Sequence, residues 1–353
     1  MSRIAVGMSG GVDSAVAAAL LIEKNHNVEG FFMKNWDDNS GFCNAEQDYN
    51  DALQVCDSLN IPLRSINFEN EYWDRVFKFF LSEYKKGRTP NPDILCNTEI
   101  KFKEFLNYTI ELGVDKIATG HYARVSYSEG KNQLLKGLDK LKDQSYFLYG
   151  LNQKQISKAL FPLGEAKKTD VRRIAKKYNF DNHNKKDSVG ICFIGKRNIK
   201  QFLNNYIPNR LGDIINTSGE KLGEHDGVMF YTIGQRKGLG IGAKNNTSHA
   251  PWYVTGKDIS NNELIVCQGH DHPSLYQTKI TAFDTHWISG DPPIEKKLNA
   301  KIRYRSNDKP CEIKKIDNKK ISVSFEEPCF AIAPGQSIVF YKNDICLGGG
   351  IIN

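Results

Sequence analysis

Hydrophobic and polar positions follow two alternating periods through the first part of the chain. Short apolar runs at 3–8 (RIAVGM) and 28–34 (VEGFFMK) predict buried strands, and the alanine- and leucine-rich stretch at 13–24 predicts a helix packed on them. Strands separated by helices indicate a parallel sheet covered on both faces, with ligands at the carboxyl ends of the strands. The same pattern continues with helices expected over 44–59, 71–86 and 98–112 and strands over 62–68 and 116–123.

The pattern changes after about residue 200. A glycine-rich and turn-rich stretch with short apolar segments predicts a small β-rich domain over 201–273. Beyond it, short alternating segments such as KKISVSFEE indicate a small barrel or sandwich over 274–353. We therefore expect an α/β fold in which a parallel-sheet domain at 1–200 is followed by a β-rich middle domain and a C-terminal β-barrel.

Composition narrows the class of protein only slightly. The chain has 353 residues, of which 40% are hydrophobic and 25% charged, a globular profile long enough for two or three domains. No apolar run approaches the roughly 20 residues of a membrane span, and the first residues lack the hydrophobic segment of a signal peptide. We expect a cytoplasmic protein with no membrane partner. The net charge of +7 suits a polyanionic partner without identifying one.

The chain contains eight cysteines and no C-x-x-C pair. This spacing favours neither a zinc ribbon nor a thioredoxin-like redox motif, and no metal site is expected. Taken one at a time, each thiol is most simply a small buried hydrophobic group. The cysteines stand at positions 43, 56, 96, 192, 267, 311, 329 and 346.

The most informative local motif is the SGGVDS loop at 9–14, directly between the first predicted strand and the first predicted helix. Its glycines let the backbone approach phosphates, its serines add hydroxyl donors, and the helix N-terminus contributes unpaired N–H groups. The Walker pattern G-x-x-x-x-G-K-S/T is absent, so the loop is unlike that of enzymes that cleave the γ-phosphate. The alternative is an ordinary strand-to-helix turn with a serine cap.

The loop resembles the pyrophosphate loop of the ATP pyrophosphatases, which cleave ATP between the α and β phosphates and pass the adenylyl group to an oxygen. The resemblance implies ATP, with Mg²⁺, as a ligand. In that fold Met33 would border the adenine, and Gly120 would let the nucleotide approach the fourth strand. The implied ATP-binding residues are Gly7, Met8, Ser9, Gly10, Gly11, Val12, Asp13, Ser14, Met33 and Gly120.

Two cysteines stand in longer motifs. Cys96 follows Asn91-Pro92-Asp93 and precedes Asn97, a candidate N-cap of the helix expected over 98–112, which puts the thiol beside a helix N-terminus where a thiolate is favoured. Cys192 lies in the glycine-containing apolar segment SVGICFIG and, taken alone, is a core residue.

Several motifs occur in order along essentially the whole chain: SGGVDS, GRTPNPDILCN around Cys96, ATGHYAR at 118–124, DQSYFLYGL at 143–151, SVGICFIG at 188–195, and APGQ with CLGGG near the end. Together they resemble the tRNA-specific 2-thiouridylases. The resemblance implies an N-terminal domain of the adenine-nucleotide α-hydrolase type. It also implies a sulfurtransferase that adenylates O2 of the wobble uridine of tRNA with ATP, releases pyrophosphate, and then replaces this oxygen with sulfur as AMP leaves.

The same resemblance assigns chemical roles. Cys192 carries a persulfide delivered by a sulfur-relay protein or a cysteine desulfurase, Cys96 is its partner, and the cycle ends with a disulfide between them or with release of sulfide. Asp93 acts as a general acid or base at the uracil edge, and Asn91 hydrogen-bonds the flipped base. The residues implied in tRNA contact are Asn91, Pro92, Asp93, His121, Asp143, Gln144, Ser145, Arg303, Tyr304 and Gln336.

Without the resemblance, these residues have plainer interpretations. The NPD tripeptide is a helix-entry turn, His121 is a structural histidine of a strand, and the segment at 143–145 is a helix start. Arg303 and Tyr304 would occupy alternating faces of an exposed strand. The basic stretch at 167–178 (KKTDVRRIAKKY) adds sequence-independent affinity for RNA or is a solvated helix face.

Two rival functions remain open. One is another adenylating enzyme with the same loop, such as a 4-thiouridine synthase or an amidotransferase-linked synthetase, although neither a glutaminase signature nor a rhodanese-like segment occurs. The other is a catalytically idle tRNA-binding scaffold, whose thiols would label no faster than a buried control such as Cys56. The expected partners are tRNAs with lysine-, glutamate- and glutamine-type anticodons. The identity of the sulfur donor, the set of tRNAs, the oligomeric state and the attacking species, sulfide or persulfide, stay open.

Overall fold

The computed structural model describes residues 1–36, 45–186, 199–241, 250–317 and 319–353. Its first domain is built on a five-stranded parallel sheet with the order β3-β2-β1-β4-β7, so the parallel sheet predicted from the sequence is confirmed. Because the strands run in one direction, their carboxyl ends meet at one edge. The strands are β1 (Arg3–Met8), β2 (Asn27–Lys34), β3 (Leu63–Asn67), β4 (Lys116–Ala118) and β7 (Ala159–Leu160).

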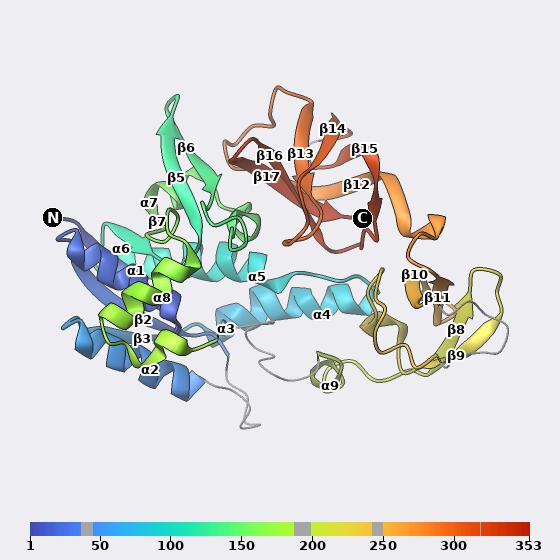
Figure 1. Ribbon diagram of the computed structural model, residues 1–353, viewed down its shortest axis with the longest axis horizontal. Coiled ribbons are helices and arrows are strands. Elements are labelled where there is room, and N and C mark those ends of the chain that lie inside the picture. The colour runs from blue at the N-terminus through green and yellow to red at the C-terminus, as the bar shows by residue number, and fades with distance from the viewer. Residues whose placement is uncertain (37–44, 187–198, 242–249, 318) are drawn as a thin grey trace.

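Helices cover both faces of this sheet (Figure 1). Ile4 and Val6 of β1 are buried against one set of helices and Ala5 against the other, as expected for side chains that alternate along a strand. The first set is α1 (Val12–Glu23), α2 (Ala45–Ser58) and α8 (Lys168–Lys177). The second set is α3 (Glu69–Tyr72), the π-helical η1 (Trp73–Phe77) and α4 (Lys78–Lys85), followed by α5 (Pro92–Leu95), the π-helical η2 (Cys96–Glu104) and α6 (Phe105–Glu111).

Two element boundaries differ from the sequence prediction. The strand expected over 116–123 ends at Ala118, because Gly120 packs directly on the start of α1. The helix expected over 98–112 begins at Pro92, so the prediction that Asn97 is its N-cap is wrong. A proline in the first helical position, preceded by Asn91 whose side chain caps the helix, is the stronger start.

A segment between β4 and β7 leaves the parallel sheet and joins the C-terminal domain. Its hairpin stands beside the barrel in Figure 1, and the second hairpin strand pairs with the last strand of the chain. The first and third domains therefore share one eight-stranded sheet. The elements of this segment are β5 (Ala123–Ser128), β6 (Lys131–Lys136), the 3-10 turn η3 (Ser145–Leu148) and α7 (Gln153–Lys158). The 3-10 turn η4 (Asp181–Asn184) comes later in the chain, after β7 and α8.

The middle domain is a four-stranded sheet with the order β10-β11-β8-β9. Ile214, Val254 and Val266 are fully buried in its small core. The β-rich middle domain is confirmed, and its boundaries at 201 and 273 stay a prediction. Its elements are α9 (Ile199–Leu203), β8 (Gly212–Asn216), β9 (Lys221–His225), the 3-10 turn η5 (Val228–Phe230), β10 (Trp252–Asp258) and β11 (Glu263–Gln268).

The C-terminal domain is a closed barrel, so the barrel expectation is confirmed over the sandwich. Its strands follow the order β12-β15-β14-β13-β16-β17, and β12 also pairs with β17, which closes the barrel. Each hydrophobic strand face points into a shared core. The elements are η6 (Pro273–Leu275), β12 (Tyr276–Trp287), β13 (Lys297–Lys301), β14 (Lys309–Lys315), β15 (Ile321–Phe330), β16 (Ser337–Lys342) and β17 (Ile345–Ile352).

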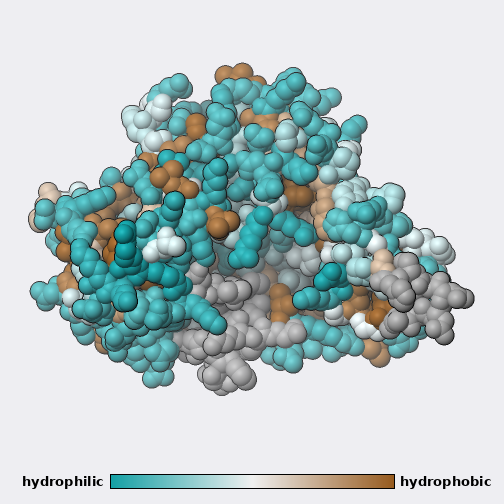
Figure 2. Space-filling view, in the orientation of Figure 1, coloured by the Kyte–Doolittle hydropathy of each residue, from teal (hydrophilic) through white to brown (hydrophobic). Residues whose placement is uncertain are grey.

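The hydrophobic core continues from the first domain into the barrel. Tyr146 and Tyr149 of the inserted segment belong to the same buried cluster as Phe105 of the first domain and Tyr341 of the barrel. The face in Figure 2 is mostly hydrophilic, with hydrophobic residues in small scattered groups. None of the helices in the described ranges combines the length and the apolar character of a membrane span.

Candidate active site

The loop between β1 and α1 is a tight backbone cradle. Gly10 has a φ of +68°, which favours glycine, and a Cβ there would lie 2.3 Å from the carbonyl oxygen of Asp48. Ser14 Oγ accepts a hydrogen bond from the N–H of Ser9 (3.2 Å) and donates one to the carbonyl oxygen of Gly11 (3.0 Å). Because the N-cap Gly11 has no side-chain acceptor, the first N–H groups of α1 can bind an anion.

Two residues that follow α8 hold this loop from outside. Asn182 Nδ2 and Lys185 Nζ both donate to the carbonyl oxygen of Gly10, at 3.1 and 3.2 Å. Lys185 also forms ion pairs with Asp48 (2.7 Å) and Asp51 of α2. The peptide is thereby fixed with its carbonyl group directed at Asn182 and Lys185. Neither residue was singled out in the sequence, because the contacts join segments far apart in the chain.

Asp13 is bonded to two residues that sequence analysis missed. Its Oδ1 accepts hydrogen bonds from Lys168 Nζ (2.7 Å) and from the hydroxyl of Tyr122 (2.8 Å). Lys168 is the first residue of α8, and its side chain is only 11% exposed. The interpretation of the 167–178 stretch as a solvated or RNA-binding face therefore does not hold for Lys168, which turns inward to the loop.

Gly120 is required by packing. A Cβ at this position would lie 2.7 Å from the carbonyl carbon of Asp13 and 2.8 Å from the backbone nitrogen of Ser14. The segment after β4 is therefore in direct contact with the start of α1. On the other side of β1, Met33 Cε lies 3.1 Å from the place of a Cβ on Gly7. Packing in the folded chain leaves little room for a side chain at either glycine. The part of both glycines in ATP binding stays a prediction.

The helix that carries Cys96 begins at the NPD turn. Asn91 Oδ1 accepts a hydrogen bond from the N–H of Asp93 (3.1 Å), and Pro92 occupies the first helical position. Cys96 is buried one turn later, where the helix changes to π-helical hydrogen bonding. Such turns are uncommon and frequent at functional sites. The sequence pattern predicts Cys96 just before the helix, next to an N-cap at Asn97; in the structure Cys96 lies inside the helix, in its second turn.

Asp93, Lys101 and His121 interact electrostatically. Burial raises the pKa of Asp93, and the ammonium group of Lys101 opposes this shift. Burial also lowers the pKa of His121 well below its ordinary value, and Lys101 lowers it further. His121 is therefore a neutral imidazole at pH 7. One lysine therefore shifts the pKa of both groups, a relationship that the sequence did not reveal.

His121 lies between aromatic rings from two elements. Its Nδ1 is 2.7 Å from Oγ1 of Thr119, and its ring centroid is 6.0 Å from that of Phe102 and 6.1 Å from that of Phe161. Phe102 belongs to the helix that carries Cys96. We call the loop at 9–14 the phosphate loop, after its predicted ligand, and the continuous helix from Pro92 the Cys96 helix. The two consequently meet around Gly120 and His121.

The second predicted cysteine, Cys192, lies outside the described residues together with the rest of its SVGICFIG motif. Its role and its relation to Cys96 stay predictions from the sequence.

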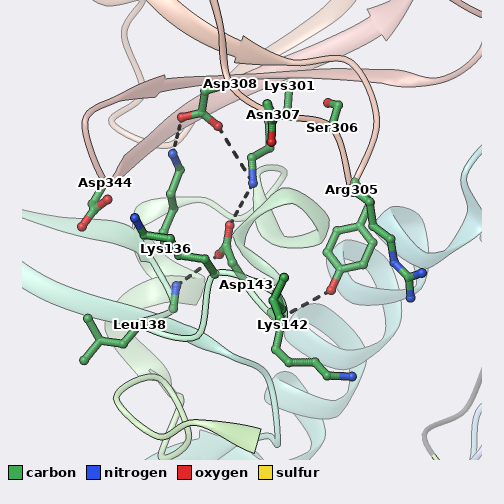
Figure 3. Close-up of a pocket in the computed structure, with 14 residues that line it drawn as sticks. Lys136, Leu138, Lys142, Asp143, Lys301, Arg305, Ser306, Asn307, Asp308 and Asp344 are labelled. Atoms are coloured by element: carbon green, nitrogen blue, oxygen red, sulfur yellow. Dashed lines mark hydrogen bonds and ion pairs between the residues drawn. The ribbon is translucent and has the colours of Figure 1, made fainter.

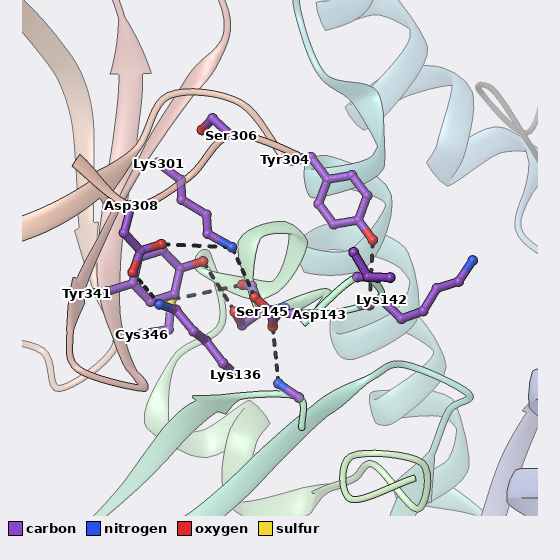
Figure 4. Close-up of polar contacts among 12 residues, drawn as sticks. Lys136, Lys142, Asp143, Ser145, Lys301, Tyr304, Ser306, Asp308, Tyr341 and Cys346 are labelled. Carbon is purple, nitrogen blue, oxygen red and sulfur yellow. Dashed lines mark hydrogen bonds and ion pairs between the residues drawn. The ribbon is translucent and has the colours of Figure 1, made fainter. Parts of the chain in front are cut away.

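Two of the three residues predicted at 143–145, Asp143 and Ser145, are buried where the first domain meets the barrel (Figure 4), and Gln144 is partly exposed. Asp143 Oδ1 accepts hydrogen bonds from the N–H groups of Gly137 and Ser145, both at 3.1 Å, and Oδ2 lies 3.2 Å from Lys301 Nζ. Ser145 is fully buried, with its Oγ 3.2 Å from the hydroxyl of Tyr341. These contacts hold the two domains together, and contact with tRNA stays a prediction.

Gln144 connects this junction to the phosphate loop. Its Oε1 accepts a hydrogen bond from the N–H of Tyr122 (3.0 Å), and its own N–H donates to the carbonyl oxygen of Tyr122 (2.9 Å). The hydroxyl of Tyr122 in turn donates to Asp13. Gln144 and Tyr122 therefore link the junction between the first domain and the barrel to Asp13 of the phosphate loop.

Arg303 and Tyr304 lie in a turn after β13, so their interpretation as alternating faces of a strand is wrong. The Arg303 guanidinium donates to the carbonyl oxygens of Ile233 (3.0 Å) and Ala331 (2.5 Å), and burial lowers its pKa. Tyr304 packs on Phe147 with ring centroids 4.4 Å apart. Arg303 thus joins the middle domain to the barrel, and its contact with tRNA stays a prediction, as does that of Tyr304.

Gln336 of the APGQ motif bridges the barrel to the first domain. Its Nε2 donates to the carbonyl oxygen of Thr89 (2.7 Å), just before the NPD turn. Its predicted contact with tRNA is not tested by this bond.

An open cavity of about 830 Å³ lies between the 136–143 segment and the turn at 301–308 (Figure 3). Its lining is mainly charged, with more basic than acidic side chains, and Tyr304 forms part of the wall. Such a lining suits a polyanion. The charged residues around it are Lys136, Lys140, Lys142, Asp143, Lys301, Arg305, Asp308 and Asp344.

Comparison with known families gives the class of protein. Residues 2–196 match the family described as the tRNA methyl transferase HUP domain. Residues 200–268 match the tRNA methyl transferase PRC-barrel domain, and residues 277–352 match the aminomethyltransferase beta-barrel domain. The chain is therefore a HUP-domain protein with two further β-domains.

Full-length relatives identify the family within this class. A tRNA-specific 2-thiouridylase MnmA from Francisella philomiragia is 54% identical over 355 residues, covering 99% of each chain. Another from Proteus mirabilis is 54% identical over 354 residues, covering 99% of this chain and 96% of the relative. The chain belongs to the tRNA-specific 2-thiouridylase family, which confirms the resemblance seen in its motifs. Among solved structures, the U34-tRNA thiolase NcsA from Methanococcus maripaludis is similar with a TM-score of 0.36 and 20% identity, over 59% of this chain and 67% of that chain.

Proposed function

We propose that this chain forms 2-thiouridine at the wobble position of tRNA by adenylating O2 of the uracil and transferring persulfide sulfur to C2. The observation that carries the proposal is the meeting, around Gly120 and His121, of the loop at 9–14 and the helix that bears Asp93 and Cys96. The reaction needs a nucleotide, a base and a thiol at one carbonyl, and the loop and this helix carry the residues that we propose for these roles.

In the first step the loop binds the phosphates of ATP. The N–H groups at the start of α1 and the hydroxyl of Ser9 cradle them, and Lys168, which lies 2.7 Å from Asp13, supplies a cation. Uracil O2 attacks the α-phosphorus, the bond to the β-phosphate oxygen breaks, and pyrophosphate leaves. The partly exposed Asp13 is the loop carboxylate that would hold Mg²⁺, which would offset the charge of the phosphates. Gly7, Met8 and Met33 border the adenine.

Asp93 takes the N3 proton of the uracil as O2 attacks. Burial raises the pKa of Asp93, so it accepts a proton more readily than an exposed carboxylate does. The neutral ring of His121, which lies between Phe102 and Phe161, supports binding of an unstacked base. Asn91 and Pro92 flank the base at the start of the helix.

The second step exchanges oxygen for sulfur. The terminal sulfur of a persulfide on Cys192 attacks C2, and the C2–O bond breaks with AMP as the leaving group. The Cys96 thiolate then attacks Cys192 Sγ, the S–S bond breaks, and a Cys96–Cys192 disulfide remains. In the alternative order, Cys96 first releases sulfide from the persulfide, and sulfide attacks C2. A thiol reductant opens the disulfide, and a sulfur-relay protein or a cysteine desulfurase recharges Cys192.

The remaining predicted residues form the surface that binds tRNAs with lysine-, glutamate- and glutamine-type anticodons. The basic lining of the cavity in Figure 3 suits phosphates, and the rings of Tyr304 and Phe147 suit unstacked bases. Asp143 and Arg303 are already engaged between domains, so we infer that they shape this surface as much as they touch RNA. The reaction takes place in the cytoplasm.

The decisive experiment compares Cys192→Ser, Cys96→Ser and the control Cys311→Ala, a buried barrel cysteine. Purified proteins receive ATP, unmodified tRNA and a persulfide donor, and nucleosides are analysed by mass spectrometry. We expect no 2-thiouridine from Cys192→Ser, tRNA binding equal to wild type, and pyrophosphate release that depends on tRNA. Wild-type amounts of 2-thiouridine from Cys192→Ser, or sulfur at C4 instead of C2, would overturn the proposal.

A further inference from the structure

The loop between α4 and α5 is bonded to both of the other domains. It leads from Lys85, the last residue of α4, to Asn91, which caps the helix that holds Asp93 and Cys96. In Figure 1 the end of α4 lies next to the middle domain and beneath the barrel. Gly87 precedes Asn91 by only four positions, so the loop leads directly into the NPD turn.

The middle domain holds the loop through three contacts. Lys257 Nζ of β10 donates to the carbonyl oxygen of Gly87 (2.7 Å), and the hydroxyl of Thr232 lies 3.1 Å from that of Thr89. The side chain of Ile259 packs on Gly87, where a Cβ would lie 2.2 Å from Ile259 Cδ1. Gly87 has a φ of +74°, so a glycine is needed for its conformation as well as for this close approach.

The barrel holds the same loop from the other side. The N–H of Thr89 donates to the carbonyl oxygen of Pro334 (2.8 Å), and Gln336 Nε2 donates to the carbonyl oxygen of Thr89 (2.7 Å). The guanidinium of Arg88 lies 5.1 Å from the ring centroid of Phe283. We call these contacts of residues 87–89 with the middle domain and the barrel the clasp.

Lys257 is the unusual member of the clasp. Burial lowers its pKa to about 8, and no charged group in the described part of the chain offsets that shift. Placing a lysine there carries a desolvation cost that an apolar residue would avoid. Within the ranges that the structure describes, its ammonium group donates one hydrogen bond, to the carbonyl oxygen of Gly87, and a charge-assisted bond to a carbonyl is short and directional. A lysine at this position is therefore explained if its hydrogen bond is needed to fix the position of Gly87.

We propose that Lys257 is a positioning residue for the reaction, which fixes Gly87 and thereby sets the NPD turn and the Cys96 helix against the phosphate loop. The proposal rests on the proposed function, because it concerns the geometry of that same site. Its consequence is that the middle domain, which contributes no residue to the predicted catalytic set, takes part in the chemistry. A tRNA that contacts the middle domain and the barrel together would act on the catalytic helix through the clasp.

The test uses the full-length protein with Lys257→Met, which keeps the apolar stem and removes the donor, and Lys257→Arg, which keeps a donor. Lys221→Met is the matched control, an exposed lysine of the same domain that pairs with Asp213 and Glu224. We expect Lys257→Met to lower kcat for 2-thiouridine formation by about tenfold or more, with KM for ATP and tRNA within about twofold. Lys257→Arg should recover most of kcat, and Lys221→Met should leave it unchanged.

Hydrogen exchange distinguishes positioning from general destabilisation. In Lys257→Met, amides of residues 87–93 should exchange faster while those of β1 and α1 keep their wild-type rates. Thr232→Val removes the other polar contact between the middle domain and the loop without removing a charge, and should also lower kcat. Wild-type kcat in both variants, or a loss accompanied by equal loss of ATP affinity and protection throughout the first domain, overturns the proposal. If wild-type protein makes no 2-thiouridine, the proposed function fails, whereas exchange at 87–93 still decides whether Lys257 fixes the loop.

Discussion

Lys168 Nζ lies 2.7 Å from Asp13 Oδ1. The first residue of α8 therefore contacts the phosphate loop, although the two residues are 155 positions apart in the chain. The ammonium group also lies 5.9 Å from the ring centroid of Tyr122, which donates to the same carboxylate. This arrangement places a positive charge beside backbone N–H groups at a helix N-terminus. A charge placed there stabilises an anion most when it is partly shielded from water, as Lys168 is.

Replacing Lys168 with methionine should slow adenylation. The change removes a cation beside the phosphates and leaves Asp13 as an uncompensated negative charge, so we expect the rate of tRNA-dependent pyrophosphate release to fall about a hundredfold. The measurement is a single-turnover assay with labelled ATP. Lys176→Met, on the same helix but exposed, serves as the control, and an unchanged rate for Lys168→Met would exclude the loop cation from the mechanism.

The pH dependence of adenylation should report Asp93. If Asp93 is the base, it works only when ionised, so the rate rises with pH through its pKa, which burial raises from the ordinary value of an aspartate. The ammonium of Lys101 opposes that shift, and Lys101→Met should therefore move the acidic limb to higher pH, with Lys101→Arg restoring it. Pyrophosphate release measured across the acidic range is the readout. A limb that falls with rising pH would instead make Asp93 the general acid.

The pair formed by Lys301 and Asp143 should contribute to the stability of the junction between the first domain and the barrel. Both side chains are largely buried, at 12% and 3% exposure, and lie 3.2 Å apart. Removing the cation with Lys301→Met leaves a buried carboxylate without its partner, which costs about 3–5 kcal/mol of unfolding free energy. Lys342→Met breaks an exposed pair with Glu295 in the same barrel and should cost less than about 1 kcal/mol. Urea unfolding compares the two variants, and equal losses would contradict the role assigned to Lys301.

The periodicity of the chain predicted the first strands and helices of the parallel-sheet domain. The strands at 3–8 and 28–34 and the helix at 13–24 match β1, β2 and α1 within one residue. These elements are encoded locally, because burial on one face of a strand or helix leaves a repeating pattern in the sequence. The motif SGGVDS likewise marks a strand-to-helix turn by itself. The start of the Cys96 helix was predicted wrongly because the local pattern allows two N-caps, Asn91 and Asn97. The sequence pattern contains no information on tertiary packing and so does not choose between them.

Which side chains meet was decided by the tertiary structure. No pattern in the sequence indicates that Lys168 reaches Asp13, that Lys101 acts on both Asp93 and His121, or that Lys257 bonds to Gly87. Each of these contacts joins segments from different elements, and its free energy depends on burial that exists only after the domains have packed. The amino-acid sequence by itself therefore determined the family, the order of its domains and the chemical groups that it carries. The folded chain determined which of those groups share a space, because desolvation and distance are properties of the packed structure.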